Sequence, residues 1–256
     1  MEELGISMLL FLVAVGVLAA FVDAVVGGGG LIAIPALLFA GLPPAMVLGT
    51  NKLAGTMCSF TSTVAFMKSG KVNKRLAFAL FPLAFVGSLF GAYTVQHISS
   101  DFLKPLMLVL LVGVTLFTIF KKNWGEQSTY NGLSKRKWVL CGVVVVAIGY
   151  YDGFFGPGTG SFLIFAFLTL GLDFVTAAGN AKVLNFASNI SGLLMFMYLG
   201  SVNYTYGIVM GLAMIVGALI GSHFAMKKGV GYVKTLFIVV SLLLIGKNAL
   251  DYFEIL

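Results

Sequence analysis

The chain has 256 residues, of which 59% are hydrophobic and 10% are charged, and its mean hydropathy is +1.04. Soluble domains carry about a quarter charged residues, so this composition excludes an ordinary soluble protein and predicts an integral membrane protein. Nearly the whole length is taken up by apolar segments, which leaves no room for a soluble catalytic domain. We therefore expect an all-α polytopic membrane protein that is not an enzyme.

The net charge of +7 is concentrated in a few places. Twelve of the 16 Lys and Arg residues lie in the loops 68–75, 121–137 and 227–234. Short loops rich in Lys and Arg are typical of the cytoplasmic side of a bilayer, so the partner of this charge is the membrane rather than nucleic acid. Cys58 and Cys141 fall within apolar segments, without metal-ligand spacing, so no metal or cofactor is expected.

The apolar segments follow one another in chain order and predict the helices. The expected segments are 6–26, 31–42, 46–67, 76–96, 102–120, 138–155, 161–172, 175–199, 205–225 and 235–252. The first lacks a basic start and a cleavage site, which favours a retained membrane segment. Segments 31–42 and 161–172 would be only about 18 Å long as helices, roughly half of the hydrocarbon core. We therefore expect 6–42 and 138–172 to be helical hairpins, with glycine-rich tips near the middle of the membrane.

The two halves of the chain align at an offset of 130 residues. Nine identities fall in the 33 columns from 41 to 73, among them Gly49/Gly179 and Lys52/Lys182, against about three expected by chance. Loop 68–75 is basic while its counterpart near 200 is not, and loop 97–104 is poor in charge while its counterpart 227–234 is basic. Equivalent loops thus prefer opposite sides of the membrane, which indicates an inverted repeat. We expect a repeat over 1–120, a cytoplasmic linker over 121–137 and a second repeat over 138–256. The total is 8–10 segments, and each repeat has a glycine-broken hairpin and three further transmembrane helices.

Polar residues within the apolar segments indicate a binding site. Lys52 and Lys182 occupy equivalent positions early in the third segment of each half. A single lysine there is readily explained by snorkelling to the membrane surface, but two in an inverted arrangement favour an anion pathway. Neighbouring polar side chains are also candidates for substrate binding: Thr50, Asn51, Asn180 and Asn185.

The glycine-rich breaks suggest a second group of ligands for an anion. A helix that begins at such a break has unpaired amides and a positive dipole end, and glycine lets the backbone approach a ligand closely. The alternative is that glycines only allow tight helix packing, which we expect for Gly87 and Gly91. The candidate tip residues are Gly28, Gly29, Gly30, Gly158, Thr159, Gly160 and Ser161.

An aspartate precedes each break by a few residues, Asp23 in the first half and Asp152 in the second. A carboxylate at membrane depth is costly unless it is protonated or paired. Each could carry a coupling proton, pair with a lysine, or cap the neighbouring backbone. The sequence leaves these three roles open.

Taken together, these motifs resemble the TauE/SafE (sulfite exporter) family of membrane transporters. The resemblance rests on Asp23 with Gly27 to Gly30, on Gly49-Thr50-Asn51-Lys52, and on the run from Asp152 to Ser161, and it covers essentially the whole chain. It implies transport of a sulfur-containing oxyanion, sulfite or an organosulfonate such as sulfoacetate, across a prokaryotic plasma membrane. The halves are not identical, since Asn51 aligns with Ala181, so the two half-sites need not contribute equally.

The prediction is a secondary transporter that binds a small anion between the inverted halves and alternates its access, with proton coupling through Asp23 or Asp152. Two other functions remain open from the sequence: a passive anion channel, and a non-transporting membrane subunit of a larger assembly. A homo-oligomer is one arrangement that the sequence allows.

Overall fold

The computed structural model describes residues 5–99, 101–103, 105–106, 109, 112 and 128–228. Its helices, in chain order, are α1 (Ile6–Val26), α2 (Gly30–Phe39), α3 (Pro44–Lys68), α4 (Lys74–Val95), α6 (Lys135–Phe154), α7 (Thr159–Thr169), α8 (Phe174–Tyr198) and α9 (Tyr204–Lys228). The described residues contain helices, turns and loops but no strand, so the predicted all-α fold is confirmed. The predicted segment 235–252 and most of 102–120 lie outside the described residues. Helix α6 begins three residues earlier than expected, inside the predicted linker.

The two short helices lie close to the predicted segments 31–42 and 161–172: each begins one or two residues before the predicted start and ends three residues before the predicted end. Helix α2 has 10 residues and α7 has 11, so each is about 15 Å long. Gly27 caps the end of helix α1, and its φ of 80° places it in the left-handed region, where glycine has no Cβ to clash. Gly156 (φ 98°) and Gly158 (φ 80°) make the corresponding break between α6 and α7. We call residues 27–30 the first tip and residues 156–160 the second tip.

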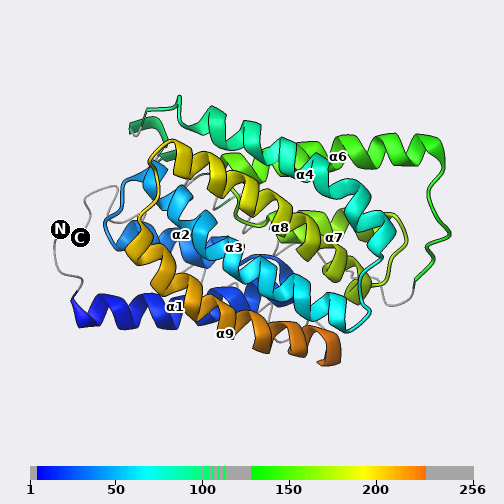
Figure 1. Ribbon diagram of the computed structural model, residues 1–256, viewed down its shortest axis with the longest axis horizontal. Helices are drawn as coiled ribbons and strands as arrows, with labels where there is room; N and C mark the ends of the chain where they lie inside the picture. The colour runs from blue at the N-terminus through cyan, green and yellow to red at the C-terminus, as the bar shows by residue number, and fades with distance from the viewer. Residues whose placement is uncertain are drawn as a thin grey trace.

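The helices form layers in which each half packs on the other (Figure 1). Helices α1 and α9 pack together on one side, α4 and α6 pack together on the other, and α3 and α8 pack against each other between them. The offset of 130 relates α1 to α6, α3 to α8 and α4 to α9. Exchanging these related helices turns the α1–α9 contact into the α4–α6 contact and leaves the α3–α8 contact unchanged. Figure 1 shows α1 and α6 running in opposite directions, as α3 and α8 do.

Local structure repeats along with the sequence. Gly70 and Gly200 close the turns after α3 and α8 with φ of 69° and 67°. Asn73 and Asn203 then accept a hydrogen bond from the amide three residues later, at 3.2 and 3.0 Å, and so begin the next helix. The aligned glycines and asparagines therefore have the same structural roles in both halves.

Glycines in α4 and α9 allow the outer helix pairs to approach closely, as expected for Gly87 and Gly91. A Cβ on Gly87 would lie 2.4 Å from the carbonyl oxygen of Val146, and one on Gly217 would lie 2.1 Å from that of Val17. Both distances are far below van der Waals contact, so only glycine fits at these crossings.

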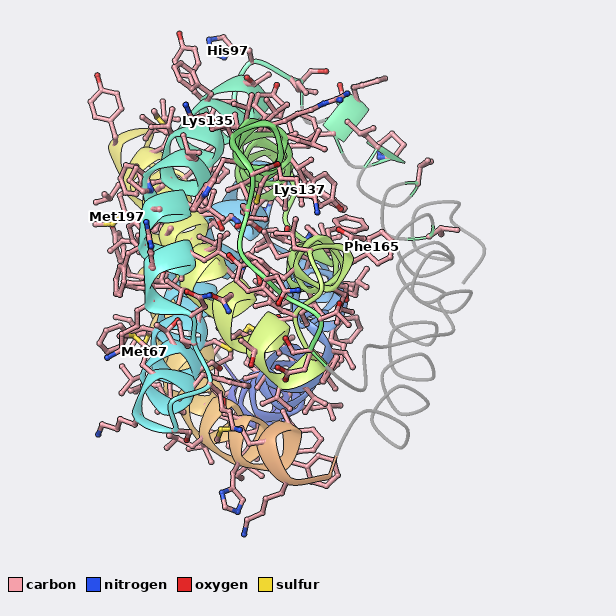
Figure 2. The ribbon with its side chains drawn as sticks, turned by 90° about the vertical axis from the view of Figure 1, so that its right-hand side faces the viewer. Met67, His97, Lys135, Lys137, Phe165 and Met197 are labelled. Carbon is pink, nitrogen blue, oxygen red and sulfur yellow. The ribbon has the colours of Figure 1, made fainter. Side chains whose placement is uncertain are left out.

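The outer surface is suited to lipid. Helices α1, α4, α6 and α9 are long and apolar enough to cross a membrane, and they expose large hydrophobic side chains such as Leu10, Phe90, Val139 and Leu219. The α3–α4 connection, the start of α6 and the end of α9 lie at the same end of the molecule (Figure 1). Figure 2 faces that end and shows Lys135 and Lys137 at the start of α6. The basic residues of these segments are thus gathered at one end.

Candidate functional site

The two tips meet inside the bundle. A Cβ on Gly27 would lie 2.2 Å from the carbonyl carbon of Gly160, and one on Gly160 would lie 2.4 Å from the Cα of Gly27. Ser161 holds the crossing, because its amide donates to the oxygen of Gly27 at 3.1 Å and its hydroxyl donates to the oxygen of Val26 at 2.6 Å. The two breaks, 130 residues apart, therefore form one structural unit.

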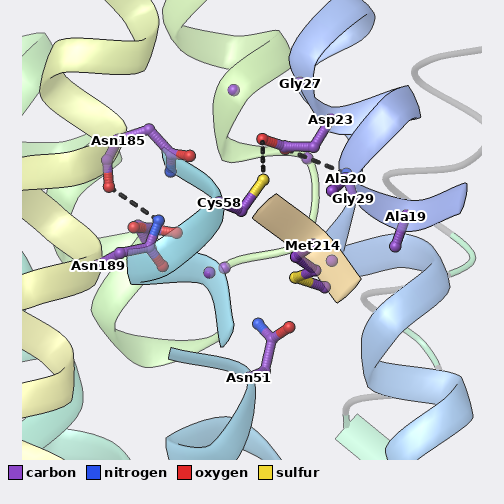
Figure 3. Close-up of a pocket in the computed structure, with 16 residues that line it drawn as sticks. Ala19, Ala20, Asp23, Gly27, Gly29, Asn51, Cys58, Asn185, Asn189 and Met214 are labelled. Carbon is purple, nitrogen blue, oxygen red and sulfur yellow. Dashed lines mark hydrogen bonds between the residues drawn. The ribbon is translucent and has the colours of Figure 1, made fainter. Parts of the chain in front are cut away.

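A cavity lies beside this crossing, with α3, α8 and α9 completing its wall (Figure 3). Its volume is about 40 Å³, and a single water needs about 10–15 Å³ on this scale. It has room for a few waters or one small solute. The lining includes these predicted residues: Asp23, Gly29, Gly30, Asn51, Asp152, Gly158, Gly160 and Asn185.

Three of the glycines that line the cavity have backbone amides without a partner among the described residues. The amides of Gly30, Gly158 and Gly160 make no hydrogen bond to any residue within the described part of the chain. Gly30 and Gly160 lie in the first turns of α2 and α7, where the helix dipole is positive. Free amides at two helix starts form a site suited to an oxyanion.

The first aspartate is paired with a lysine of the other half. Lys182 Nζ on α8 lies 2.7 Å from Oδ2 of Asp23 and also donates to the backbone oxygen of Asp23. The other carboxylate oxygen, Oδ1, accepts the amide of Gly29 at 3.2 Å. Asp23 thus pairs with a lysine and caps the first tip at the same time.

The second aspartate is paired in the reciprocal way. Lys52 Nζ on α3 lies 3.0 Å from Oδ1 of Asp152, and both side chains are 2% exposed. The lysine reaches this position by passing Gly192 of α8, where a Cβ would stand 3.2 Å from its Cδ and Cε. Lys52 Nζ and Asp152 Oδ2 have no well-directed hydrogen bond among the described residues.

The two pairs settle how the lysines are placed. Lys52 is 2% exposed and Lys182 is 0% exposed, so neither extends to the membrane surface. When both lysines and both aspartates are ionised, the four side chains together carry no net charge. Each pair joins a residue of one half of the chain to a residue of the other half. Because a broken buried pair leaves an uncompensated charge, each pair also ties a tip to the central helix of the opposite half.

The remaining predicted positions do not line the cavity. Three of them make side-chain hydrogen bonds within the fold: Thr50 Oγ1 accepts the amide of Asn203 at 2.9 Å, Thr159 Oγ1 donates to Gly156 O at 2.7 Å, and Asn180 Nδ2 donates to Thr176 O at 2.7 Å. Gly28 and Ser161 belong to the tip crossing, and the two lysines contact the cavity only through their aspartates.

Several lining residues were not among the predicted site residues: Ala19, Ala20, Gly27, Gly55, Cys58, Gly156, Asn189 and Met214. Gly27 and Gly156 belong to the glycine runs that the sequence pointed to. Gly55 and Asn189 lie four residues beyond Asn51 and Asn185, so helical periodicity would have placed them on the same face. Nothing in the sequence singles out Cys58, whose Sγ lies 3.8 Å from Oδ2 of Asp23 (Figure 3). No three His, Cys, Asp or Glu residues in the described ranges cluster as metal ligands would.

Comparison with known proteins gives a consistent result. The sequence model of the family described as "Sulfite exporter TauE/SafE" matches residues 12–248. The chain is 37% identical over 245 residues to "Probable membrane transporter protein ORF9" of Sinorhizobium sp., covering 95% of this chain and 93% of that protein. It is 37% identical over 251 residues to a "Probable membrane transporter protein" of Haemophilus influenzae, with 97% of both chains covered. It is also 36% identical over 238 residues to the "Probable membrane transporter protein YfcA" of Escherichia coli K12, covering 93% and 88%. No solved structure matches.

Proposed function

Since the chain belongs to the TauE/SafE family of membrane transporters, we propose that it is a secondary transporter for a small sulfur-containing anion, sulfite or a small organosulfonate such as sulfoacetate. The cavity at the tip crossing is the proposed substrate site. The transporter acts in a prokaryotic plasma membrane, with the basic loops 68–75, 121–137 and 227–234 on the cytoplasmic side.

The single observation that carries this proposal is the set of unused donors around the cavity. The free amides of Gly30, Gly158 and Gly160 point to a ligand that accepts several hydrogen bonds at once. Sulfite and sulfonate groups have three oxygens around one sulfur and meet this requirement. The amides of Asn51 and Asn185 add side-chain donors, and the 40 Å³ volume favours a small anion over a bulky one.

The helix arrangement supports alternating access. Helices related by the offset run in opposite directions and exchange their packing partners, as an inverted repeat requires. The proposed site lies at the contact between the two halves, so rocking one half against the other would open it to one side at a time. The driving energy would come from an ion or substrate gradient, with an aspartate at the site as the proton carrier.

The test is transport by the purified protein in liposomes. Radiolabelled sulfite, sulfoacetate, thiosulfate and sulfate are supplied separately, with and without a pH gradient, and empty liposomes serve as the blank. We expect saturable uptake of sulfite or sulfoacetate, and counterflow when unlabelled substrate is trapped inside. Flux that rises linearly with concentration and shows no counterflow would instead identify a channel. Absence of uptake for every one of these anions would refute the proposed substrate class.

A further inference from the structure

The two ion pairs occupy equivalent positions in the two halves, but their surroundings differ. Lys182 has two oxygen acceptors on Asp23, one on the side chain and one on the backbone. Both carboxylate oxygens of Asp23 also have partners, Lys182 on Oδ2 and the amide of Gly29 on Oδ1. Both charged groups of this pair have hydrogen-bond partners, and the pair fixes the first tip.

The other pair leaves bonding capacity unused. Among the residues that the structure describes, Oδ2 of Asp152 is buried without a hydrogen-bond donor, and Lys52 Nζ, which can donate three hydrogen bonds, has Oδ1 of Asp152 at 3.0 Å as its ion-pair partner. Asp152 lines the cavity, and a Cβ on the neighbouring Gly156 would lie 3.3 Å from Lys52 Nζ. Burying an unpartnered carboxylate oxygen is costly, whereas a proton on it removes the charge. The ammonium group of Lys52 then has no counter-charge and can bind an anion from the cavity.

From this difference we infer that the two ion pairs have different roles in transport. The inference rests on the proposed function and deepens it. Asp152 carries the coupling proton, and Lys52 is the positive charge that receives the sulfur oxyanion. The pair of Asp23 and Lys182 stays intact through the cycle and holds the first tip in place.

The step balances in charge and in protons. A proton from the side of higher proton concentration converts the carboxylate of Asp152 into a carboxylic acid, and Lys52 gains a monoanion in place of it. The loaded centre is then as neutral as the empty one, which lowers the cost of crossing the low-dielectric interior. On the other side the anion leaves, the proton leaves Asp152, and the ion pair forms again. One proton moves with each monoanion, and no net charge crosses.

The charged and titratable neighbours of Asp152 are few, so the assignment can be tested one group at a time. Helix α3 provides Lys52, and α6 itself provides Tyr151, whose hydroxyl is bonded to the oxygen of Pro157 at 2.8 Å. At the first-tip side of the site, α1 provides Asp23, α3 provides Cys58 and α8 provides Lys182. Helix α7 has no titratable residue, and those of α4, which are Lys74, Arg75 and Tyr93, are exposed and do not line the cavity.

The experiment compares Asp152→Asn with the matched variant Asp23→Asn in proteoliposomes. The probe is radiolabelled methanesulfonate, a monoanion that does not titrate in the working range, with sulfite as a second substrate. An inward proton gradient should stimulate uptake by the wild-type protein, and a membrane potential should not. Asp152→Asn should lose this stimulation completely but retain counterflow that no longer depends on pH. Asp23→Asn should keep the stimulation, even if less protein folds.

The results distinguish a failure of the proposed function from a failure of the assignment of the proton to Asp152. If the wild-type protein moves no sulfur anion, the proposed function fails. If it does, and Asp152→Asn still responds to the proton gradient or Asp23→Asn loses its response, the assignment to Asp152 is overturned. Should Asp152→Asn not fold, Asp152→Glu replaces it. Its pH profile for counterflow should shift relative to the wild type while that of Asp23→Glu does not, and the opposite pattern overturns the inference.

Discussion

The crossing of the two tips can be tested by adding a single methyl group. Gly27→Ala places a Cβ 2.2 Å from the carbonyl carbon of Gly160 and 2.4 Å from the amide of Ser161, and it does so at a φ of 80°. A left-handed conformation costs an L-residue about 1–2 kcal/mol. Forcing a methyl into packed surroundings costs about 1–3 kcal/mol more, and here the neighbour is backbone that cannot rotate away. The total is about 2–5 kcal/mol of unfolding free energy.

Two control variants separate the contributions. Gly41→Ala has the same backbone requirement, with a φ of 83°, but nothing lies within 4 Å of the added Cβ, so only the cost of about 1–2 kcal/mol applies. Gly160→Ala faces Gly27 Cα at 2.4 Å without a left-handed backbone. Replacing glycine in a helix gains about 1 kcal/mol, so its net cost should be about 0–2 kcal/mol.

The measurement is denaturant unfolding of the three purified variants in detergent, together with counterflow in liposomes. Gly27→Ala should be the least stable of the three, and its transport rate should fall because the free amides of the tips are displaced. If Gly27→Ala lowers the unfolding free energy no more than Gly41→Ala does, the two tips do not contact each other as described. The position of the cavity beside them would then be contradicted as well.

Three further predictions concern the side chains at the site. Lys182→Ala should lower the unfolding free energy by about 3 kcal/mol, because it leaves the carboxylate of Asp23, which is only 15% exposed, without its ammonium partner. The double variant with Asp23→Leu should recover much of that loss in the same unfolding assay, and strict additivity would contradict the pairing. Asn51→Ala should raise KM for the transported anion because Asn51 lines the cavity, whereas Thr50→Val should cost about 1 kcal/mol of stability and leave KM unchanged. Cys58 should react with a small thiol reagent more slowly when substrate is present, and equal labelling rates would place the anion elsewhere.

Much of the fold could be predicted because membranes impose strong rules on sequence. Apolar length fixed the expected helices, and the glycine runs located the breaks before α2 and α7 to within a few residues. The reciprocal partners of the charged residues could not be predicted in the same way. Local sequence places Asp23 on α1 and Lys182 on α8, but only the packing of α1 and α8 around the crossed tips brings these side chains within 2.7 Å.

The polar neighbours of the lysines show a second feature that the sequence could not predict, namely the direction in which a side chain on α3 faces. Thr50 and Asn51 are adjacent in sequence and equally polar, but they lie about 100° apart around α3, as helix geometry requires. One faces the start of α9 and bonds the amide of Asn203, while the other faces the cavity. Which face of α3 is which depends on the helices that surround it, and the sequence of α3 alone does not contain that information.

The differences between the halves then explain how a symmetric scaffold can hold an asymmetric site. The repeat preserves the residues that build the frame, such as the turn glycines and the two lysines. It does not preserve the cavity wall, where Gly55 corresponds to Asn185 and Ser59 corresponds to Asn189. Two of the three asparagines that line the cavity, Asn185 and Asn189, therefore lie on α8. The small Gly55 leaves room for Asn189, whose Oδ1 would lie 3.0 Å from a Cβ there. An anion bound in such a cavity would meet different groups on its two sides. This asymmetry agrees with the proposal that one lysine–aspartate pair exchanges a proton for the anion while the other holds the first tip in place.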